Sequence, residues 1–69
     1  MPILKTKINE LRKLHNMQQA ELATLVGVRR ETIGNLENGK YNPSLKLAMD
    51  IAKIFNKSVE EIFFYMDEE

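Results

Sequence analysis

Cysteine is absent from this sequence of 69 residues. Its absence excludes a disulfide framework and any metal site built on thiolates, and it favours a reducing compartment, so we expect a cytoplasmic protein. Long apolar runs are also absent: none approaches the roughly 20 residues of a membrane-spanning helix, and the first residues lack the apolar core of a signal peptide. We expect residues 1–69 to form one small domain with no membrane partner.

Net charge is lacking too, because ten basic residues balance ten acidic ones. The bulk charge therefore gives no indication of a nucleic-acid partner. The distribution is uneven, however: residues 1–40 have a balance of +3 and residues 41–69 a balance of −3. One interpretation is a basic face with an acidic tail. The other is the chance unevenness of any small domain, and charge alone does not decide between them.

Groups suited to catalysis are scarce. The single histidine, His15, falls at the end of a helical segment, where histidine is more often a helix C-terminal partner than a base. No serine has a matching base, and the sequence contains no phosphate-binding loop and no ligand set with metal spacing. We therefore expect no enzyme, no metal and no cofactor, and no small-molecule ligand is evident.

Glycine and proline are few, and most of them mark helix ends. Gly27 and the pair 38–39 (Asn-Gly) each follow a segment with helical apolar spacing, as residues that end a helix do. The next helix can begin in two ways. Either Asn42 caps it, with Pro43 as the first helical residue, or Ser44 does.

Apolar residues recur at intervals of three and four, the spacing of helices with one face in a core. Near the end, Ser58 and Glu61 form a capping box, after which β-prone aromatic residues begin. These signals predict an all-α fold, a compact bundle of five helices: roughly 6–15, 18–25, 29–37, one beginning at 42–44 and one beginning at 58. Only Gly-Val-Arg joins the second helix to the third, which predicts a steep helix-turn-helix crossing.

The remaining glycine, Gly34, lies inside the third predicted helix, where it costs about 0.5–1 kcal/mol relative to alanine. On a helical wheel Ile33 and Leu36 take one side. The opposite side, here called the polar arc, consists of Arg29, Arg30, Glu31, Gly34, Asn35 and Asn38. Drift near a helix end explains Gly34 without a function. Alternatively, its missing side chain lets the backbone approach another surface, such as the floor of a major groove.

The side chains of this helix also have the chemistry of base recognition. Arg30 can donate two hydrogen bonds to guanine, and Asn35 can pair with adenine. Glu31 can accept from cytosine, Thr32 can offer a methyl or hydroxyl group, and Arg29 can reach a base or a phosphate. Glu31 fits this set less well, because a carboxylate near the phosphates of DNA lowers the affinity for DNA unless it meets a cytosine amine or an arginine. A merely solvated helix face is the alternative for the whole set.

The segment QAELATLVGVRRETIGNLENGKYNPSLKLAMDIAKIFNKSVEEIF carries these features in a fixed order. Gln19 opens the second helix, Ala23 is the small residue at the crossing, and Gly27 makes the turn. With this ordered set the chain resembles the DNA-binding domain of the lambdoid phage repressor and Cro family, also called the Xre family. The resemblance covers roughly residues 8–63 and implies that the third helix reads DNA in the major groove.

The resemblance also implies roles for individual residues. It implies base contacts from Arg29, Arg30, Glu31, Thr32 and Asn35, and phosphate contacts from Gln18, Gln19, Asn38, Lys40 and Tyr41. It further implies a structural pair between Arg12 and Glu37, which we leave out of the DNA-contacting set. Gln18 and Arg29 depart from the Ser or Thr that the family often has at these helix caps. Either the two helices begin one residue later, or these side chains serve DNA.

The apolar residues near the two ends suggest a subunit contact. They either fold back over their own domain or join a second chain through a short β-ribbon with the N-terminal Pro-Ile-Leu. The chain resembles very short regulators of this family that dimerise through the fifth helix and nearby strands. We expect residues 62–69 to act as a dimerisation tail, with these interface residues: Ile3, Ile62, Phe64, Tyr65 and Met66.

The function expected from these observations is sequence-specific regulation of transcription, as a repressor that binds double-stranded DNA at a palindromic operator as a homodimer. The alternative is a helix-turn-helix module for protein interaction, such as an antitoxin or antirepressor. A protein-binding face would show exposed leucine, phenylalanine or tryptophan, whereas the polar arc shows arginine, glutamate and asparagine. The composition of the arc therefore favours DNA.

Overall fold

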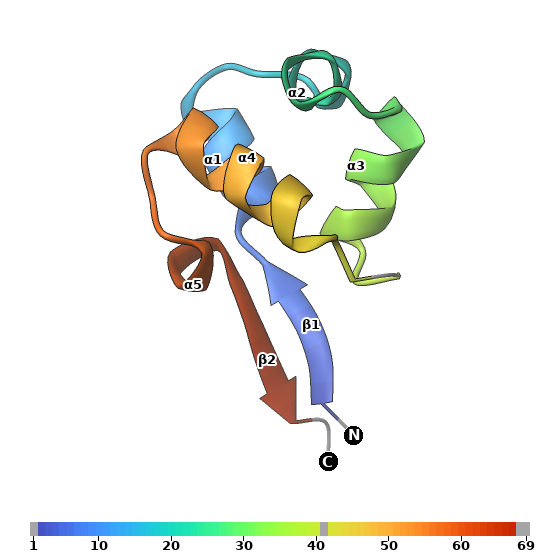
Figure 1. The fold of residues 1–69 in the computed structure, drawn as a ribbon, viewed down its shortest axis with the longest axis vertical. Coiled ribbons are helices and arrows are strands. Elements are labelled where there is room, and N and C mark those ends of the chain that lie inside the picture. Colours follow the sequence, from blue (N-terminus) through green and yellow to red (C-terminus); the bar gives the residue numbers. More distant parts are fainter. Residues whose placement is uncertain (1, 41, 68–69) are drawn as a thin grey trace.

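The computed structural model describes residues 2–40 and 42–67. Within these ranges a strand lies at each end of the chain and five helices lie between them (Figure 1), in the order β1 (Pro2–Thr6), α1 (Ile8–Leu14), α2 (Gln19–Val26), α3 (Arg30–Glu37), α4 (Leu45–Phe55), α5 (Val59–Ile62) and β2 (Phe63–Asp67). The predicted five-helix fold is confirmed, and the terminal ribbon forms within one chain, between β1 and β2. None of the helices in the described ranges is long and apolar enough to cross a membrane.

Local hydrogen bonds decide where the helices begin. α1 begins at Ile8 rather than near residue 6, because Thr6 belongs to β1; its Oγ1 nevertheless accepts from the Ile8 amide at 3.3 Å. α2 and α3 each begin one residue later than predicted, so Gln18 and Arg29 are N-cap residues in extended backbone. Of the two candidate caps of α4, Ser44 is the one used, and its hydroxyl accepts from a first-turn amide at 3.1 Å.

α5 is a single turn that leads directly into β2. Its predicted capping box is present: Ser58 N–H donates to Glu61 Oε1 at 2.8 Å, and Glu61 N–H donates to Ser58 Oγ at 3.2 Å. Ile62 closes the helix and is fully buried. The prediction that Ile62 lies at a subunit contact is therefore wrong, because its side chain faces the core of its own chain and leaves no surface for a second one.

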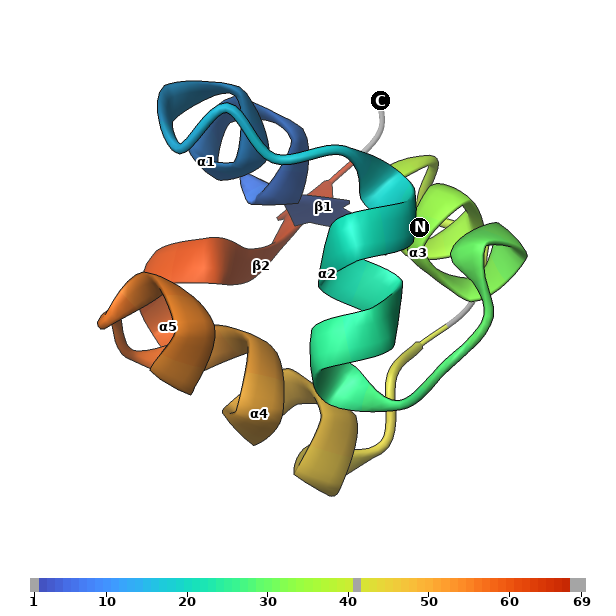
Figure 2. The same cartoon turned by 90° about the horizontal axis from the view of Figure 1, so that it is seen from above.

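One core joins all the helices. Each of the five described helices contributes at least one large side chain that is fully buried: Ile8, Leu22, Ile33, Leu36, Ile51 and Ile62. α2 packs against both α3 and α4 and lies between them when the molecule is seen from above (Figure 2). Because Ile33 and Leu36 are held in this core, the opposite side of α3 faces away from it.

The β-ribbon brings the two ends of the described chain together. β1 and β2 pair antiparallel, from Pro2 opposite Asp67 to Thr6 opposite Phe63, and the ribbon extends away from the helices (Figure 1). Gly39, in the turn after α3, has φ +70°, and a Cβ there would lie 2.8 Å from the Leu4 carbonyl oxygen. Glycine is needed at this point, because any side chain would displace β1 from the end of α3.

Candidate nucleic-acid interface

α2 and α3 form the helix-turn-helix. Gly27 ends α2 in the left-handed conformation, with φ 74°, and the Val28 amide returns to the Ala23 carbonyl at 3.0 Å. This tight turn lets α3 follow after only three residues and cross α2 steeply, as Figure 2 shows. Ala23 is buried near the crossing, where a small side chain lets two helices pack closely.

The polar arc of α3 is open to solvent. Arg29, Arg30, Glu31, Asn35 and Asn38 are exposed, whereas Gly34 and the neighbouring Thr32 are half-buried. Around the arc, Gln18 and Lys40 are exposed and Gln19 is half-buried. Tyr41, a predicted phosphate contact, lies outside the described residues. The described candidates lie on α3 and its N-cap, at the start of α2 and just beyond the end of α3, with two arginines and one glutamate on the arc itself.

A buried ion pair fixes the end of α3 to α1. Arg12 Nε donates to Glu37 Oε2 at 2.6 Å, and Arg12 Nη2 donates to Glu37 Oε1 at 3.1 Å. The two side chains are only 10% and 6% exposed. Arg12 Nη1 also donates to the Met17 carbonyl at 2.9 Å, which ties in the loop before α2. The pair implied by the family resemblance is thus present, and its role is structural.

The Gln19 amide connects this ion pair to the polar arc. Its Nε2 donates to Glu37 Oε1 at 3.1 Å, and its Oε1 accepts from Arg30 Nη1 at 3.1 Å. Gln19, a predicted phosphate contact, and Arg30, a predicted base contact, are therefore hydrogen-bonded to each other in the unbound protein. No pattern in the sequence predicts this bridge, nor the contact of Asn9, whose Nδ2 donates to Glu37 Oε1 at 3.3 Å.

Gly34 lies next to the side-chain amide of Gln19. A Cβ built at Gly34 would lie 3.8 Å from Gln19 Nε2 and 3.9 Å from Oε1, which is ordinary van der Waals contact. A methyl group therefore fits at this position without any displacement. The packing of the protein itself does not require glycine here, so the two interpretations of Gly34 made from the sequence both stand.

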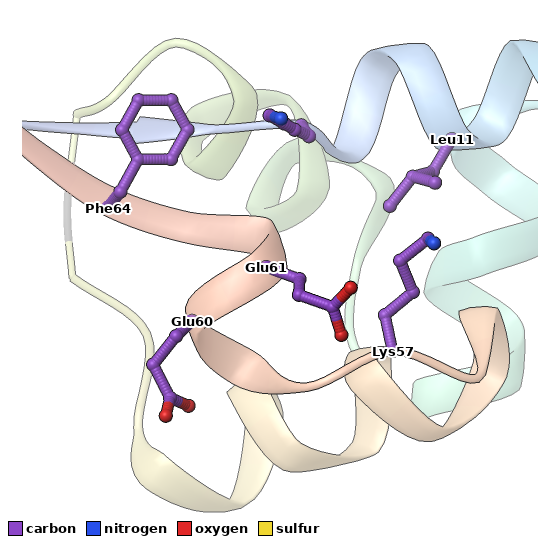
Figure 3. Close-up of a pocket in the computed structure, with 6 residues that line it drawn as sticks. Leu11, Lys57, Glu60, Glu61 and Phe64 are labelled. Carbon is purple, nitrogen blue, oxygen red and sulfur yellow. The ribbon is translucent and has the colours of Figure 1, made fainter.

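A surface hollow lies away from the polar arc. It has a volume of about 410 Å³ and lies between α1, α5 and β2, as Figure 3 shows, with these lining residues: Lys7, Leu11, Lys57, Glu60, Glu61 and Phe64. In Figure 3 the Glu61 carboxylate extends into this hollow and the Lys57 side chain extends towards Leu11. Hydrogen bonds from Ser58 lower the pKa of Glu61 below its usual value. The lining has two lysines and two glutamates and so is balanced in charge, whereas the polar arc has two arginines and one glutamate.

The Glu37 carboxylate should make the protein sensitive to acid. Desolvation raises its pKa, but hydrogen bonds from Arg12, Gln19 and Asn9 and the charge of Arg12 together lower it below the usual value. A lowered pKa in the folded state adds stability that is present above the unfolded pKa of about 4.3 and is lost as the pH falls through the folded value. We expect Glu37→Gln to destabilise the protein at pH 7. We also expect its free energy of unfolding to decrease less than that of the parent when the pH falls below about 4.

Urea unfolding at a series of pH values measures this effect. Glu10→Gln is the matched control, because it removes an exposed carboxylate from α1. With this variant the free energy of unfolding should fall with decreasing pH as it does in the parent. If the free energy of unfolding of Glu37→Gln falls with decreasing pH as steeply as that of the parent, the ion pair is not the origin of the pH dependence.

Comparison with known proteins agrees with this geometry. A family described as "Helix-turn-helix" matches residues 8–62. An HTH-type transcriptional regulator of Archaeoglobus fulgidus is 59% identical over 66 residues, which are 96% of this chain and 93% of its own. The antitoxin PezA of Streptococcus pneumoniae is 38% identical over 55 residues, which are 80% of this chain and 35% of its own.

Two solved structures share the fold over most of the chain. The restriction-modification controller protein C.AhdI from Aeromonas hydrophila has a TM-score of 0.72 and 31% identity, over 80% of this chain and 83% of its own. The transcriptional regulator VanUg has a TM-score of 0.81 and 25% identity, over 97% of this chain and 89% of its own. The chain belongs to the helix-turn-helix family of the Xre and Cro type and is a DNA-binding regulator of transcription.

Proposed function

We propose that this chain represses transcription as a homodimer that binds a palindromic operator, with α3 of each subunit in the major groove. The observation that carries the proposal is the exposed polar arc, which is backed by Ile33 and Leu36 in the core. A helix held rigidly on one side and polar on the other is suited to reading base edges. Two such helices about 34 Å apart meet successive major grooves on one face of DNA.

Within the polar arc we assign base contacts to Arg30 and Asn35 first. Both are exposed, and their side chains have the paired donors and acceptors that distinguish guanine and adenine. Arg30 is already oriented by Gln19 Oε1, so less side-chain freedom is lost on binding. Arg29, Glu31 and Thr32 complete the set, with Glu31 directed at cytosine.

Apart from Asn38, the residues to which we assign phosphate contacts lie around the polar arc rather than on it. Gln18 and Gln19 lie at the start of α2, where helix amides carry partial positive charge and attract phosphate. Asn38 and Lys40 lie beyond the end of α3, and both are exposed. We also keep Tyr41 in this set on the family resemblance. Such contacts fix the register of the protein on DNA, while the arc supplies sequence choice.

The homodimer would use the apolar residues of the ribbon, which we take as Ile3, Phe64, Tyr65 and Met66. Tyr65 and Met66 are exposed. A single domain of this size makes few DNA contacts, so a second copy is needed to raise the affinity for an operator with two half-sites. Occupying a promoter in this way would block polymerase.

Base-reading and phosphate-binding variants should behave differently on an operator selected from random DNA. We expect Arg30→Ala and Asn35→Ala each to lose about 1–3 kcal/mol of discrimination at one or two operator positions, with the fold retained. Lys40→Ala should instead weaken all sequences alike and reduce the slope of log affinity against log salt by about 0.9. Fluorescence anisotropy over a salt series, with the operator and scrambled DNA, measures both.

Lys57→Ala is the matched control for Lys40→Ala, because Lys57 lines the hollow near α5 rather than the polar arc. It should leave affinity and salt slope unchanged. Unaltered sequence preference in both Arg30→Ala and Asn35→Ala would show that the arc does not read bases. DNA affinity that does not vary with salt would favour a protein-interaction module instead.

Replacing Gly34 by alanine separates stability from DNA binding. The new methyl group fits beside Gln19 and should stabilise α3 by about 0.5–1 kcal/mol. If the backbone of α3 approaches the groove at this point, the same methyl group should weaken operator binding, and Gly34→Leu should weaken it further. Thermal unfolding and anisotropy measure the two effects, and equal operator affinity in all three proteins would rule out close approach.

A further inference from the structure

The turn after α3 contains an Asn-Gly pair, the dipeptide in which an asparagine amide is lost most readily. Of the six asparagines in the chain, only Asn38 is followed by glycine. Because glycine has no side chain, the backbone nitrogen of Gly39 is less hindered than that of any other residue that could follow an asparagine. Asn38 is exposed and is the C-cap of α3, so its side-chain amide is accessible to water.

The fold requires the glycine of this pair. Gly39 has φ +70°, and a Cβ there would lie 2.8 Å from the Leu4 carbonyl oxygen. A larger residue would strain the turn and displace β1 from the end of α3. Packing therefore fixes the second residue of the pair, and the chain keeps the susceptible dipeptide for as long as it keeps Asn38.

Backbone hydrogen bonds hold the turn closed in the folded protein. Gly39 N–H donates to the Leu36 carbonyl at 3.1 Å, and Lys40 N–H donates to the Asn35 carbonyl at 2.9 Å. While these bonds are in place, the Gly39 nitrogen is not free to approach the side chain before it. Opening the last turn of a helix costs less free energy than unfolding the domain. The turn therefore opens while the rest of the domain stays folded.

We propose that Asn38 is a deamidation site and that the deamidated protein binds its operator more weakly. In the open turn, the Gly39 nitrogen attacks the side-chain carbonyl carbon of Asn38. A carbon–nitrogen bond forms to the backbone, the bond to the side-chain amide breaks, and the amide leaves as ammonia with the proton of the Gly39 N–H. Water then opens the resulting succinimide ring at either carbonyl, which gives aspartate or isoaspartate without any oxidant or reductant.

The position of Asn38 gives this reaction an effect on DNA binding. This step rests on the proposed function, in which Asn38 contacts a phosphate. The polar arc has two arginines and one glutamate, so a new carboxylate at position 38 cancels its net positive charge. A carboxylate also repels a phosphate and only accepts hydrogen bonds, whereas the asparagine amide donates them. DNA that holds the turn closed should protect Asn38, while the free protein loses affinity with age.

Mass spectrometry of protein aged in mildly alkaline buffer tests the site. Peptide mapping should find deamidation at Asn38 ahead of the other five asparagines. The reaction should be fastest in urea, slower in the folded protein and slowest with operator DNA present. Asn38→Gln is the matched control, because its longer side chain would have to close a larger ring, and it should keep its amide over the same period.

Asn38→Asp reproduces one product of the reaction and tests its effect. By fluorescence anisotropy with the selected operator, we expect its dissociation constant to rise at least about tenfold, because a hydrogen bond to a charged phosphate is lost. Asn56→Asp adds the same charge at the exposed C-cap of α4, on the opposite side of the molecule from α3 (Figure 1), and should leave the affinity unchanged. Circular dichroism checks that both variants are folded.

The outcomes separate this modification from the proposed function. Deamidation at Asn38 that is no faster than at other asparagines, or Asn38→Asp that binds the operator as tightly as the parent, would overturn the inference while leaving operator binding in place. Equal rates with and without the operator would also count against it. A parent that prefers no operator would contradict the proposed function, whereas preferential loss of the Asn38 amide would still establish the modification site.

Discussion

The ion pair between Arg12 and Glu37 is the contact on which the reading surface depends. It is almost fully buried, and removing one partner from such a pair costs about 3–5 kcal/mol because the other charge stays buried alone. The pair ties the end of α3 to α1, and the Gln19 amide extends it to Arg30. One chain of hydrogen bonds thus runs from the inside of the domain to its polar arc.

The core divides the surface into two regions with different roles. Inward side chains from every helix meet in one cluster, so the polar arc of α3 and the exposed Tyr65 and Met66 of the ribbon are both left outside it. The first is polar and held rigidly from behind, which suits reading a groove. The second is apolar, which suits the proposed contact with a second copy. Together they are the two surfaces that the proposed binding of a two-fold operator would need.

Local signals explain why much of the fold could be predicted from the sequence. Ser58 and Glu61 lie three residues apart, and Gly27 ends α2 by its own backbone conformation, so both are visible in the sequence. Ile62 was misplaced because apolar residues in succession do not reveal which one faces the core. The Arg12–Glu37 pair, 25 residues apart, followed only from the family resemblance. The Gln19–Arg30 bridge depends on side-chain directions across two helices, which spacing does not encode.

Nuclear magnetic resonance of the isotope-labelled protein with its selected operator is the most direct test of the central claim. If the polar arc meets DNA, we expect the largest amide shift changes at Gly34, Asn35 and the start of α2, with small changes at residues lining the hollow near α5, such as Lys57. Large changes confined to α5 and the ribbon, with α3 unaffected, would contradict this claim, because the polar arc would then not be the surface that meets DNA.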